Sequence, residues 1–296
     1  MIDLHIHTIH SDGTDTVEEL LLNAEKANLE IISITDHDSV GAYKELEKEE
    51  IRRLFSGKII VGTELKTHYK GIPIEVLAYG IDYNKMRIHK INLYDIQVKV
   101  LEEYKKIGKK LGFVFDDSIS ISKTDAKRKF AAFVFANEIF KHEENKKILF
   151  EIGEECEVAT FYRVHSCNKN SIFYYDDTQN YLPLEETIER IHEAGGIAIV
   201  AHPLLYPYDN EDKFAEIEKM VQEYKLDGIE VEYPLFSKED REKLKEIAKK
   251  YNKYISGGTD YHAENKPEIK IGTGINENMN ICTEMVEDWI YNAKEI

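Results

Sequence analysis

The chain has few cysteines and no long apolar run. Its three cysteines, Cys156, Cys167 and Cys282, are an odd number without a C-x-x-C pair, which argues against a disulfide framework and a thiolate zinc site. No apolar run approaches the roughly 18 residues that a membrane helix needs. The start also lacks the basic-then-apolar pattern of a signal peptide. These absences predict a cytoplasmic protein with reduced thiols and no membrane partner.

Basic residues are outnumbered by acidic ones. The sequence holds 39 Lys and Arg residues against 56 Asp and Glu residues, a formal net charge of −17 over 296 residues. Binding of duplex nucleic acid depends on basic patches, so no such partner is expected. A small phosphorylated substrate remains compatible with this charge, because bound cations can reverse the field locally. The length and the 42% hydrophobic content suit a large globular domain that buries its own core.

Short β-branched runs alternate with segments of helical period in two parts of the chain. Thr16-Val17-Glu18-Glu19 has the form of a capping box that opens a helix. Repeated βα units favour an α/β fold with parallel strands, either open or closed into a barrel. Strands are expected at residues 2–7, 30–35, 58–65, 72–79, 197–201, 228–231 and 254–256.

The alternation breaks in the middle of the chain. Residues 86–177 are rich in Lys, Glu, Phe and Tyr and hold few strand-like runs. We expect a mostly helical inserted subdomain that caps the site, between residues 1–85 and 178–296 of the main domain. Aromatic residues of the insertion, such as Phe161 and Phe173, either pack its core or stack on a base.

Histidines and carboxylates follow the ends of the expected strands. His5 and His7 are two residues apart on one strand, so both side chains leave the same face, with Cα atoms about 7 Å apart. Asp260 and His262 repeat this spacing, and Asp12 lies in a Ser-Asp-Gly loop just past the first pair. Neutral imidazoles and carboxylates hold divalent metals, and strand ends are where barrel folds place their chemistry. The pattern therefore predicts a metal site.

Three further positions fit the same pattern. His37 follows a buried run and lies between Asp36 and Asp38, either of which could orient the imidazole or cap the next helix, with capping favoured for Asp38. Glu64 ends an expected strand, and His202 follows another. Taken singly, an exposed strand end and a structural histidine explain these two. Only the whole set favours metal binding.

The segments that carry these residues resemble the successive motifs of the PHP (polymerase and histidinol phosphatase) phosphoesterases. The resemblance spans residues 1–83 and 181–276 and implies a distorted (β/α)₇ barrel with two to three divalent ions, Mn, Fe or Zn, at the strand ends. The matching segments are DLHIHTIHSDGT, ISITDHDSVGAY, IVGTELKT, HEAGGIAIVAHP, GIEVEYP and SGGTDYHAENKPEIKIGTG.

The resemblance also implies how the ligands are shared among the ions. One ion takes His5, His7, Glu64 and Asp260, a second takes Asp12, His37 and His262, and Glu64 bridges to a third that His202 also holds. Many members complete the third site with a histidine, but this chain has Glu75 at the matching position in EVLAYGID. A carboxylate there favours Mn²⁺ or Mg²⁺. His68 is the alternative donor.

The activity that the resemblance implies is phosphoester hydrolysis by metal-activated water, with no catalytic residue beyond the metal cluster. His202 or His262 would protonate the leaving group only if it were free of metal. The motifs are most similar to the branch that hydrolyses nucleotide phosphates such as 3′,5′-bisphosphates, with Arg128 and Arg163 as candidate phosphate ligands or, alternatively, solvated surface charges. Other possibilities are an exonuclease or phosphodiesterase for short oligonucleotides, a histidinol-phosphate-type phosphatase, and a non-catalytic metal-binding module.

Overall fold

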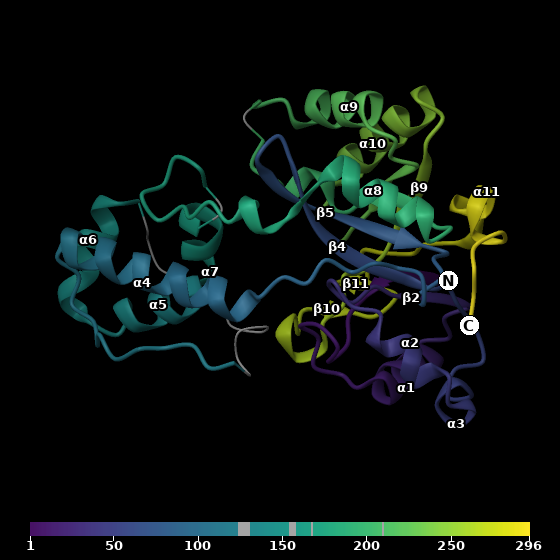
Figure 1. Cartoon of the computed structure of the whole chain (residues 1–296), viewed down its shortest axis with the longest axis horizontal. Coiled ribbons are helices and arrows are strands. Elements are labelled where there is room, and N and C mark those ends of the chain that lie inside the picture. Colours follow the sequence, from purple (N-terminus) through teal and green to yellow (C-terminus); the bar gives the residue numbers. More distant parts are fainter. Residues whose placement is uncertain (124–130, 154–157, 167, 209) are drawn as a thin grey trace. The chain divides into compact units, whose positions relative to one another are not determined.

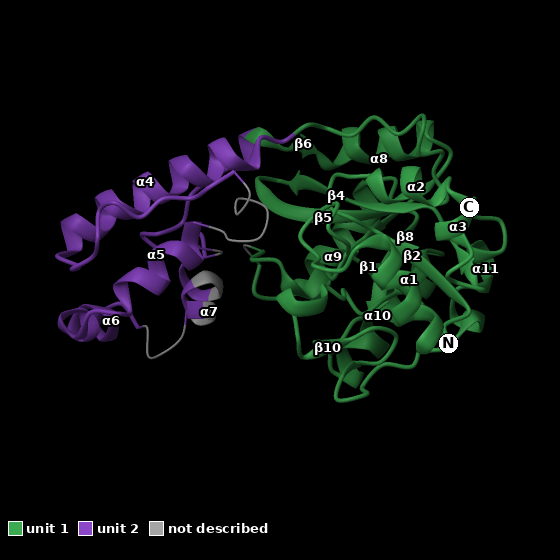
Figure 2. Ribbon diagram, turned by 90° about the horizontal axis from the view of Figure 1, so that it is seen from below, with its two compact units in different colours: residues 1–90, 180–296 green, residues 91–179 purple. Residues whose placement is uncertain are grey.

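The structure, a computed structural model, describes residues 1–123, 131–153, 158–166, 168–208 and 210–296. The chain divides into two compact units (Figure 2). The first comprises Met1–Lys90 and Asn180–Ile296, and the second comprises Ile91–Gln179. Each unit buries an apolar core of its own. Among the described residues, no helix combines the length and the apolar character needed to cross a bilayer.

Strands and helices alternate along the first unit (Figure 1). Its strands are β1 (Ile2–Ile6), β2 (Ile31–Ile34), β3 (Lys58–Ile59), β4 (Gly62–Tyr69), β5 (Ile72–Tyr79), β6 (Leu182–Pro183), β7 (Ile197–Val200), β8 (Gly228–Glu232), β9 (Tyr254–Gly257), β10 (Ile269–Lys270) and β11 (Gly274–Ile275). Its α-helices are α1 (Val17–Lys26), α2 (Gly41–Leu46), α3 (Glu49–Arg52), α8 (Leu184–Glu193), α9 (Lys213–Glu223), α10 (Lys238–Lys250) and α11 (Glu287–Ile290).

The larger strands form two sheets. One has the order β6-β4-β5-β7-β8-β9 and the other the order β1-β2-β3, while β10 and β11 form a small ribbon. Single bridges, Ile6 with Tyr261 and His37 with Glu64, join residues of the two sheets or their flanks. The fold is thus mixed α/β with a central sheet, and the ladders of the described residues do not close into one continuous barrel.

The expectation of parallel strands holds for β1 with β2, β7 with β8 and β8 with β9, but it is wrong for β5. β5 runs antiparallel to both β4 and β7. Lys70 and Gly71 alone connect β4 to β5, with φ of 49° and 76°. Two residues of positive φ make a hairpin turn, whereas a parallel crossover needs a dozen or more residues.

The helices of the first unit follow most of the expected signals. Thr16 caps α1, and the reciprocal bonds with Glu19 confirm the capping box. α8 ends just before Gly195, whose φ of 82° stops the helix. Residues 39–56 contain two short helices, α2 and α3, instead of one long helix, because Lys48 between them has an extended backbone.

The second unit is helical in its described residues. It contains α4 (Leu93–Leu111), α5 (Ala131–Ile139), α6 (Lys146–Glu151) and α7 (Val158–Phe161), followed by a π-helical turn at Tyr162–Ser166. Phe161 and Phe173 are fully buried in its core, with ring centroids 5.0 Å apart. Of the two alternatives for these aromatic residues, packing is therefore the one observed.

Candidate metal centre

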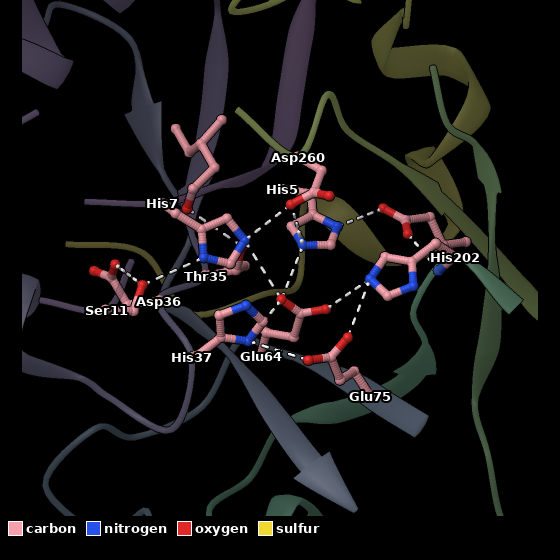
Figure 3. A network of polar contacts seen from close by, with 12 residues as sticks. His5, His7, Ser11, Thr35, Asp36, His37, Glu64, Glu75, His202 and Asp260 are labelled. Atoms are coloured by element: carbon pink, nitrogen blue, oxygen red, sulfur yellow. Dashed lines mark hydrogen bonds and ion pairs between the residues drawn. The ribbon is translucent and has the colours of Figure 1, made fainter. Parts of the chain in front are cut away.

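Histidines and carboxylates from separate strand ends converge in the first unit (Figure 3). His5 lies on β1 and His7 directly after it, with ring centroids 5.1 Å apart, as their spacing predicts. His37 follows β2, and Glu64 and Glu75 lie on the neighbouring strands β4 and β5. The loops after β1, β7 and β9 add Asp12, His202, Asp260 and His262.

Every residue of the expected ligand set belongs to a group that could hold a metal ion. In each group, one candidate ligand atom per residue lies within 4.8 Å of the others. The groups are His7, Asp12, His37 and His262; His5, Glu64 and His202; His5, His7 and Asp260; and His37, Glu64 and Glu75. They overlap at His5, His7, His37 and Glu64, so the arrangement is one cluster rather than separate sites.

Glu64 lies at the centre of the cluster and is fully buried. Its Oε2 atom is 3.2 Å from His5 Nε2 and 3.2 Å from His37 Nδ1, and its Oε1 atom is 3.0 Å from His202 Nε2. Burial raises the pKa of Glu64, but the imidazoles around it outweigh this effect and hold the pKa well below its ordinary value. The two carboxylate oxygens therefore face different histidines, as a bridging ligand requires.

Glu75 completes this side of the cluster. Its Oε1 atom is 3.4 Å from His37 Nδ1, and its Oε2 atom is 3.5 Å from His202 Nε2. Burial and the nearby charge of Glu64 raise the pKa of Glu75 to about 7. A bound cation would offset both effects. His68, the alternative donor, is in none of the candidate groups found among the described residues.

Two of the imidazoles, His7 and His37, suit metal binding in their protonation. Around His5 and His202 the nearby carboxylates outweigh burial, so the pKa of His5 is well above its ordinary value and that of His202 is about 8. Burial lowers the pKa of His7 to about 3 and that of His37 to about 4, so both are neutral at pH 7, the form that binds metals. His7 Nε2, His37 Nδ1 and Asp12 Oδ1 are buried without a hydrogen-bond partner. Such orphan polar atoms are costly unless another group satisfies them. The donor set thus fits divalent ions.

Asp260 divides its two oxygens between imidazoles and other donors. Its Oδ1 atom is 3.3 Å from both His7 Nε2 and His262 Nδ1. Its Oδ2 atom accepts hydrogen bonds from the Tyr233 hydroxyl at 2.7 Å and the Lys266 ammonium at 2.5 Å. Sequence reasoning missed Tyr233 and Lys266, since neither residue type in a loop signals a contact with a distant aspartate.

The two aspartates beside His37 do not act as expected. Asp38 does not cap α2, because the cap residue is Val40, and its Oδ1 atom instead accepts from the backbone N–H of Lys66 at 3.2 Å. Asp36 turns to the loop after β1, where it binds Thr8 and Ser11. The Asp38 carboxylate thus accepts a hydrogen bond from the backbone of β4 instead of capping α2.

The candidate phosphate-binding arginines cannot be placed beside the cluster. Arg128 lies outside the described residues. The backbone of Arg163 belongs to the π-helical turn of the second unit, and its side chain is also outside what the structure describes. Among the described side chains, Lys266 is a cation that hydrogen-bonds directly to a member of the cluster.

Two relatives and one solved structure show what this chain is similar to. A 5′-3′ exoribonuclease of Haemophilus influenzae is 26% identical over 88% of this chain and 89% of its own length. A 3′,5′-nucleoside bisphosphate phosphatase of Chromobacterium violaceum is 23% identical over 92% of this chain and 90% of its own. A solved structure from Bifidobacterium adolescentis shares the fold, with a TM-score of 0.65 and 21% identity over 99% of this chain and 96% of that one.

The PHP domain matches residues 3–261, which hold the cluster except for His262. The match covers most of the chain and, apart from Ile2 of β1, all strands of the two larger sheets. The chain therefore belongs to the PHP domain family, which confirms the resemblance and with it the prediction of a phosphoester hydrolase.

Proposed function

We propose that this chain is a metal-dependent phosphatase that removes a phosphate monoester from a nucleotide, such as a 3′,5′-bisphosphate, or from another small phosphorylated molecule. The observation that carries the proposal is the position of Glu64. This buried carboxylate contacts imidazoles from several strand ends, an arrangement that suits a cluster of divalent ions.

The proposed ligands divide as the family resemblance implies. Asp12, His37 and His262 would hold one ion, and His5, His7, Glu64 and Asp260 would hold a second. Glu64 would also bind a third ion together with His202 and Glu75, and every one of these residues belongs to a candidate group. Divalent ions bound there would supply positive charge to phosphoryl oxygens and activate water as a nucleophile. Four carboxylates against three divalent ions leave a local charge of about +2, which attracts a phosphate dianion.

Hydrogen bonds orient two of the histidines so that one ring nitrogen of each faces a carboxylate of the cluster. His262 Nδ1 donates to the carbonyl oxygen of Asp260 at 2.8 Å, so Nε2, which lies 3.1 Å from Asp12, is the ring nitrogen that would bind an ion. His5 Nδ1 donates to Glu230 at 2.8 Å, which leaves Nε2 for Glu64. This arrangement supports ligation by His262 over its alternative role as proton donor.

The second candidate is an exonuclease for short oligonucleotides, which the exoribonuclease relative favours because the alignment covers most of both chains. The net charge of −17 favours the small substrate, since an RNA track needs basic residues. A histidinol-phosphate-type phosphatase fits the same metal cluster. A non-catalytic module is disfavoured, since every member of the ligand set is present in the cluster.

A substrate panel distinguishes these functions. Purified protein with measured metal content is given a 3′,5′-bisphosphate nucleotide, a 5′-mononucleotide, histidinol phosphate and a 5′-phosphorylated tetranucleotide, each with Mn²⁺, Fe²⁺ or Zn²⁺. We expect inorganic phosphate from the bisphosphate and loss of release in Asp260→Asn and His37→Ala. Release of mononucleotides from the tetranucleotide, with no phosphate from the small substrates, would establish the exonuclease. Protein that binds metal yet hydrolyses none of the panel would refute the phosphatase proposal.

Two architectural proposals accompany this function. The ladders and the two single bridges link β1, β2, β4, β5, β7, β8 and β9 in a ring, which supports a distorted (β/α)₇ barrel. We propose that the second unit acts as a cap and supplies phosphate ligands from Arg128 and Arg163. Alanine variants of both arginines should raise KM without changing metal content. An unchanged KM in both would contradict this role.

A further inference from the structure

Three buried carboxylates lie beside the metal cluster but outside its expected ligand set. Asp3 and Glu230 are fully buried and Asp36 is 1% exposed. Each accepts a hydrogen bond from the backbone N–H of a residue at the end of a neighbouring strand. Buried carboxylates need such donors, so the bonds explain how these acids are accommodated. They also connect the acids to the backbone that carries the cluster.

Asp3 holds the residue that precedes Asp260. Its Oδ1 atom accepts from the backbone N–H of Thr259 at 2.9 Å, and its Oδ2 atom accepts from the Thr259 hydroxyl at 2.6 Å. Oδ2 also accepts from the backbone N–H of Gly272 at 2.8 Å. Asp260 itself has a φ of 56°, in the left-handed region. The bonds to Thr259 thus fix the backbone at the point where an unusual conformation directs Asp260 into the cluster.

Asp36 repeats this arrangement one strand further along the sheet. Its Oδ1 atom accepts from the backbone N–H of Thr8, and its Oδ2 atom accepts from the Thr8 hydroxyl, both at 2.7 Å. Oδ1 also accepts from the Ser11 hydroxyl at 2.7 Å (Figure 3). Thr8 follows His7, and Ser11 precedes Asp12. The same two-point bond to a threonine therefore occurs beside two different parts of the cluster.

Glu230 joins two histidines of the cluster. Its Oε1 atom accepts from His5 Nδ1 at 2.8 Å, and its Oε2 atom accepts from the backbone N–H of His202 at 2.6 Å. His202 also has a positive φ, 24°. One side chain on β8 therefore orients the ring of His5 and holds the backbone of His202, whose imidazoles both face Glu64.

We propose that Asp3, Asp36 and Glu230 are positioning residues that set the geometry of the metal cluster before any ion binds. This inference rests on the proposed function, because the ions concerned are those of the proposed phosphatase. Outer hydrogen bonds of this kind orient ligands and typically change metal affinity by about 10- to 100-fold. The alternative is that the three acids stabilise the fold alone, in which case metal affinity does not depend on them once the protein is folded.

Paired substitutions at the threonines separate these two roles. Thr8→Val and Thr259→Val keep the shape of the side chain and the backbone N–H but remove the hydroxyl donor, whereas Thr8→Ser and Thr259→Ser keep both donors. Glu230→Gln keeps the shape but replaces one acceptor oxygen with a donor. Glu232→Gln is its control, because Glu232 lies on the same strand and pairs with Arg241 and Lys245 instead of the cluster.

The measurement is a Mn²⁺ titration of metal-free protein, followed by the electron paramagnetic resonance signal of free Mn²⁺, with folding checked by circular dichroism. We expect the valine variants and Glu230→Gln to bind Mn²⁺ about 10-fold or more weakly, and the serine variants and Glu232→Gln within about 2-fold of wild type. Folded valine and glutamine variants with wild-type affinity would overturn the positioning role. Wild-type protein that binds no divalent ion would instead refute the proposed function.

Discussion

Replacing Glu75 by glutamine should stabilise the metal-free protein and reduce the stability that the protein gains from divalent ions. In the metal-free protein, burial and the charge of Glu64 raise the pKa of Glu75 to about 7 from 4.5. Between these two pH values the folded state binds more protons than the unfolded state. Stability therefore falls as pH rises through this window, and the ionised carboxylate is destabilising above it.

The size of this penalty follows from the pKa shift. A shift of about 2.5 units at about 1.4 kcal/mol per unit gives an upper limit of roughly 3 kcal/mol. The Glu75 side chain is 21% exposed, so solvent screening reduces the penalty, and we expect about 1–2 kcal/mol. Glutamine carries no charge. Metal-free Glu75→Gln should accordingly be more stable than wild type by this amount at pH 8 and nearly equal to it at pH 5.

Urea denaturation in EDTA at pH 5 and pH 8 measures this difference, and the same experiment in Mn²⁺ measures the opposite one. With Mn²⁺ the variant should gain less stability than wild type, because one ligand is lost. Glu232→Gln is the control, since Glu232 faces the cations Arg241 and Lys245 and its loss should destabilise the metal-free protein. A metal-free Glu75→Gln that is less stable than wild type at pH 8 would refute the reasoning.

Three other outcomes test different parts of the structure. Gly258→Ala should lower the free energy of unfolding by about 1–3 kcal/mol in urea denaturation, because the new Cβ would lie 2.3 Å from His5 N and Cβ; a neutral effect would contradict this packing. Glu138→Gln should lower the free energy of unfolding by about 1–3 kcal/mol at pH 7. Hydrogen bonds from the Lys141 side chain, the Asp116 backbone N–H and the His142 side chain lower the pKa of Glu138 to about 2. That loss should shrink as pH falls from about 4.5 towards 2, and a constant loss would contradict the assignment. In calorimetry, EDTA should lower the melting temperature of protein held at a free metal concentration of about 1,000 times Kd, because bound metal at that concentration adds about 4 kcal/mol to the free energy of unfolding. An unchanged melting temperature would argue against bound ions.

The sequence allowed the positions of the cluster to be predicted because local patterns mark strand ends. His5 with His7, and Asp260 with His262, are each two residues apart, a spacing that does not depend on the rest of the fold. The parallel pairing of β1 with β2 and of β8 with β9 brings the carboxyl ends of these strands together. Taken by itself, Glu64 could equally have been an exposed strand end, yet it is fully buried within β4. Its burial depends on neighbours that no local pattern specifies.

The contacts that hold the cluster in place could not be predicted in the same way. Asp3 and Thr259 are 256 residues apart in the chain, and His5 and Glu230 are 225 apart. The sequence of a buried strand does not show whether its aspartate binds a metal, accepts a hydrogen bond from a threonine or caps a helix. The antiparallel course of β5 depends on the conformation of the two-residue turn at Lys70 and Gly71, which strand periodicity does not encode.

The groups around each buried acid distinguish two roles, fixing the backbone and binding a metal, which the sequence alone does not distinguish. Asp3 and Asp36 accept from backbone N–H groups and hydroxyls, which are neutral donors that satisfy a carboxylate without a cation. Glu64 faces imidazoles instead, and imidazoles in their neutral form are ligands for divalent ions. We therefore propose that acids of the first kind fix the backbone and that acids of the second kind bind the ions. On this proposal, the cluster around His5 and His7 combines a framework of neutral hydrogen bonds with a set of ligands for divalent ions.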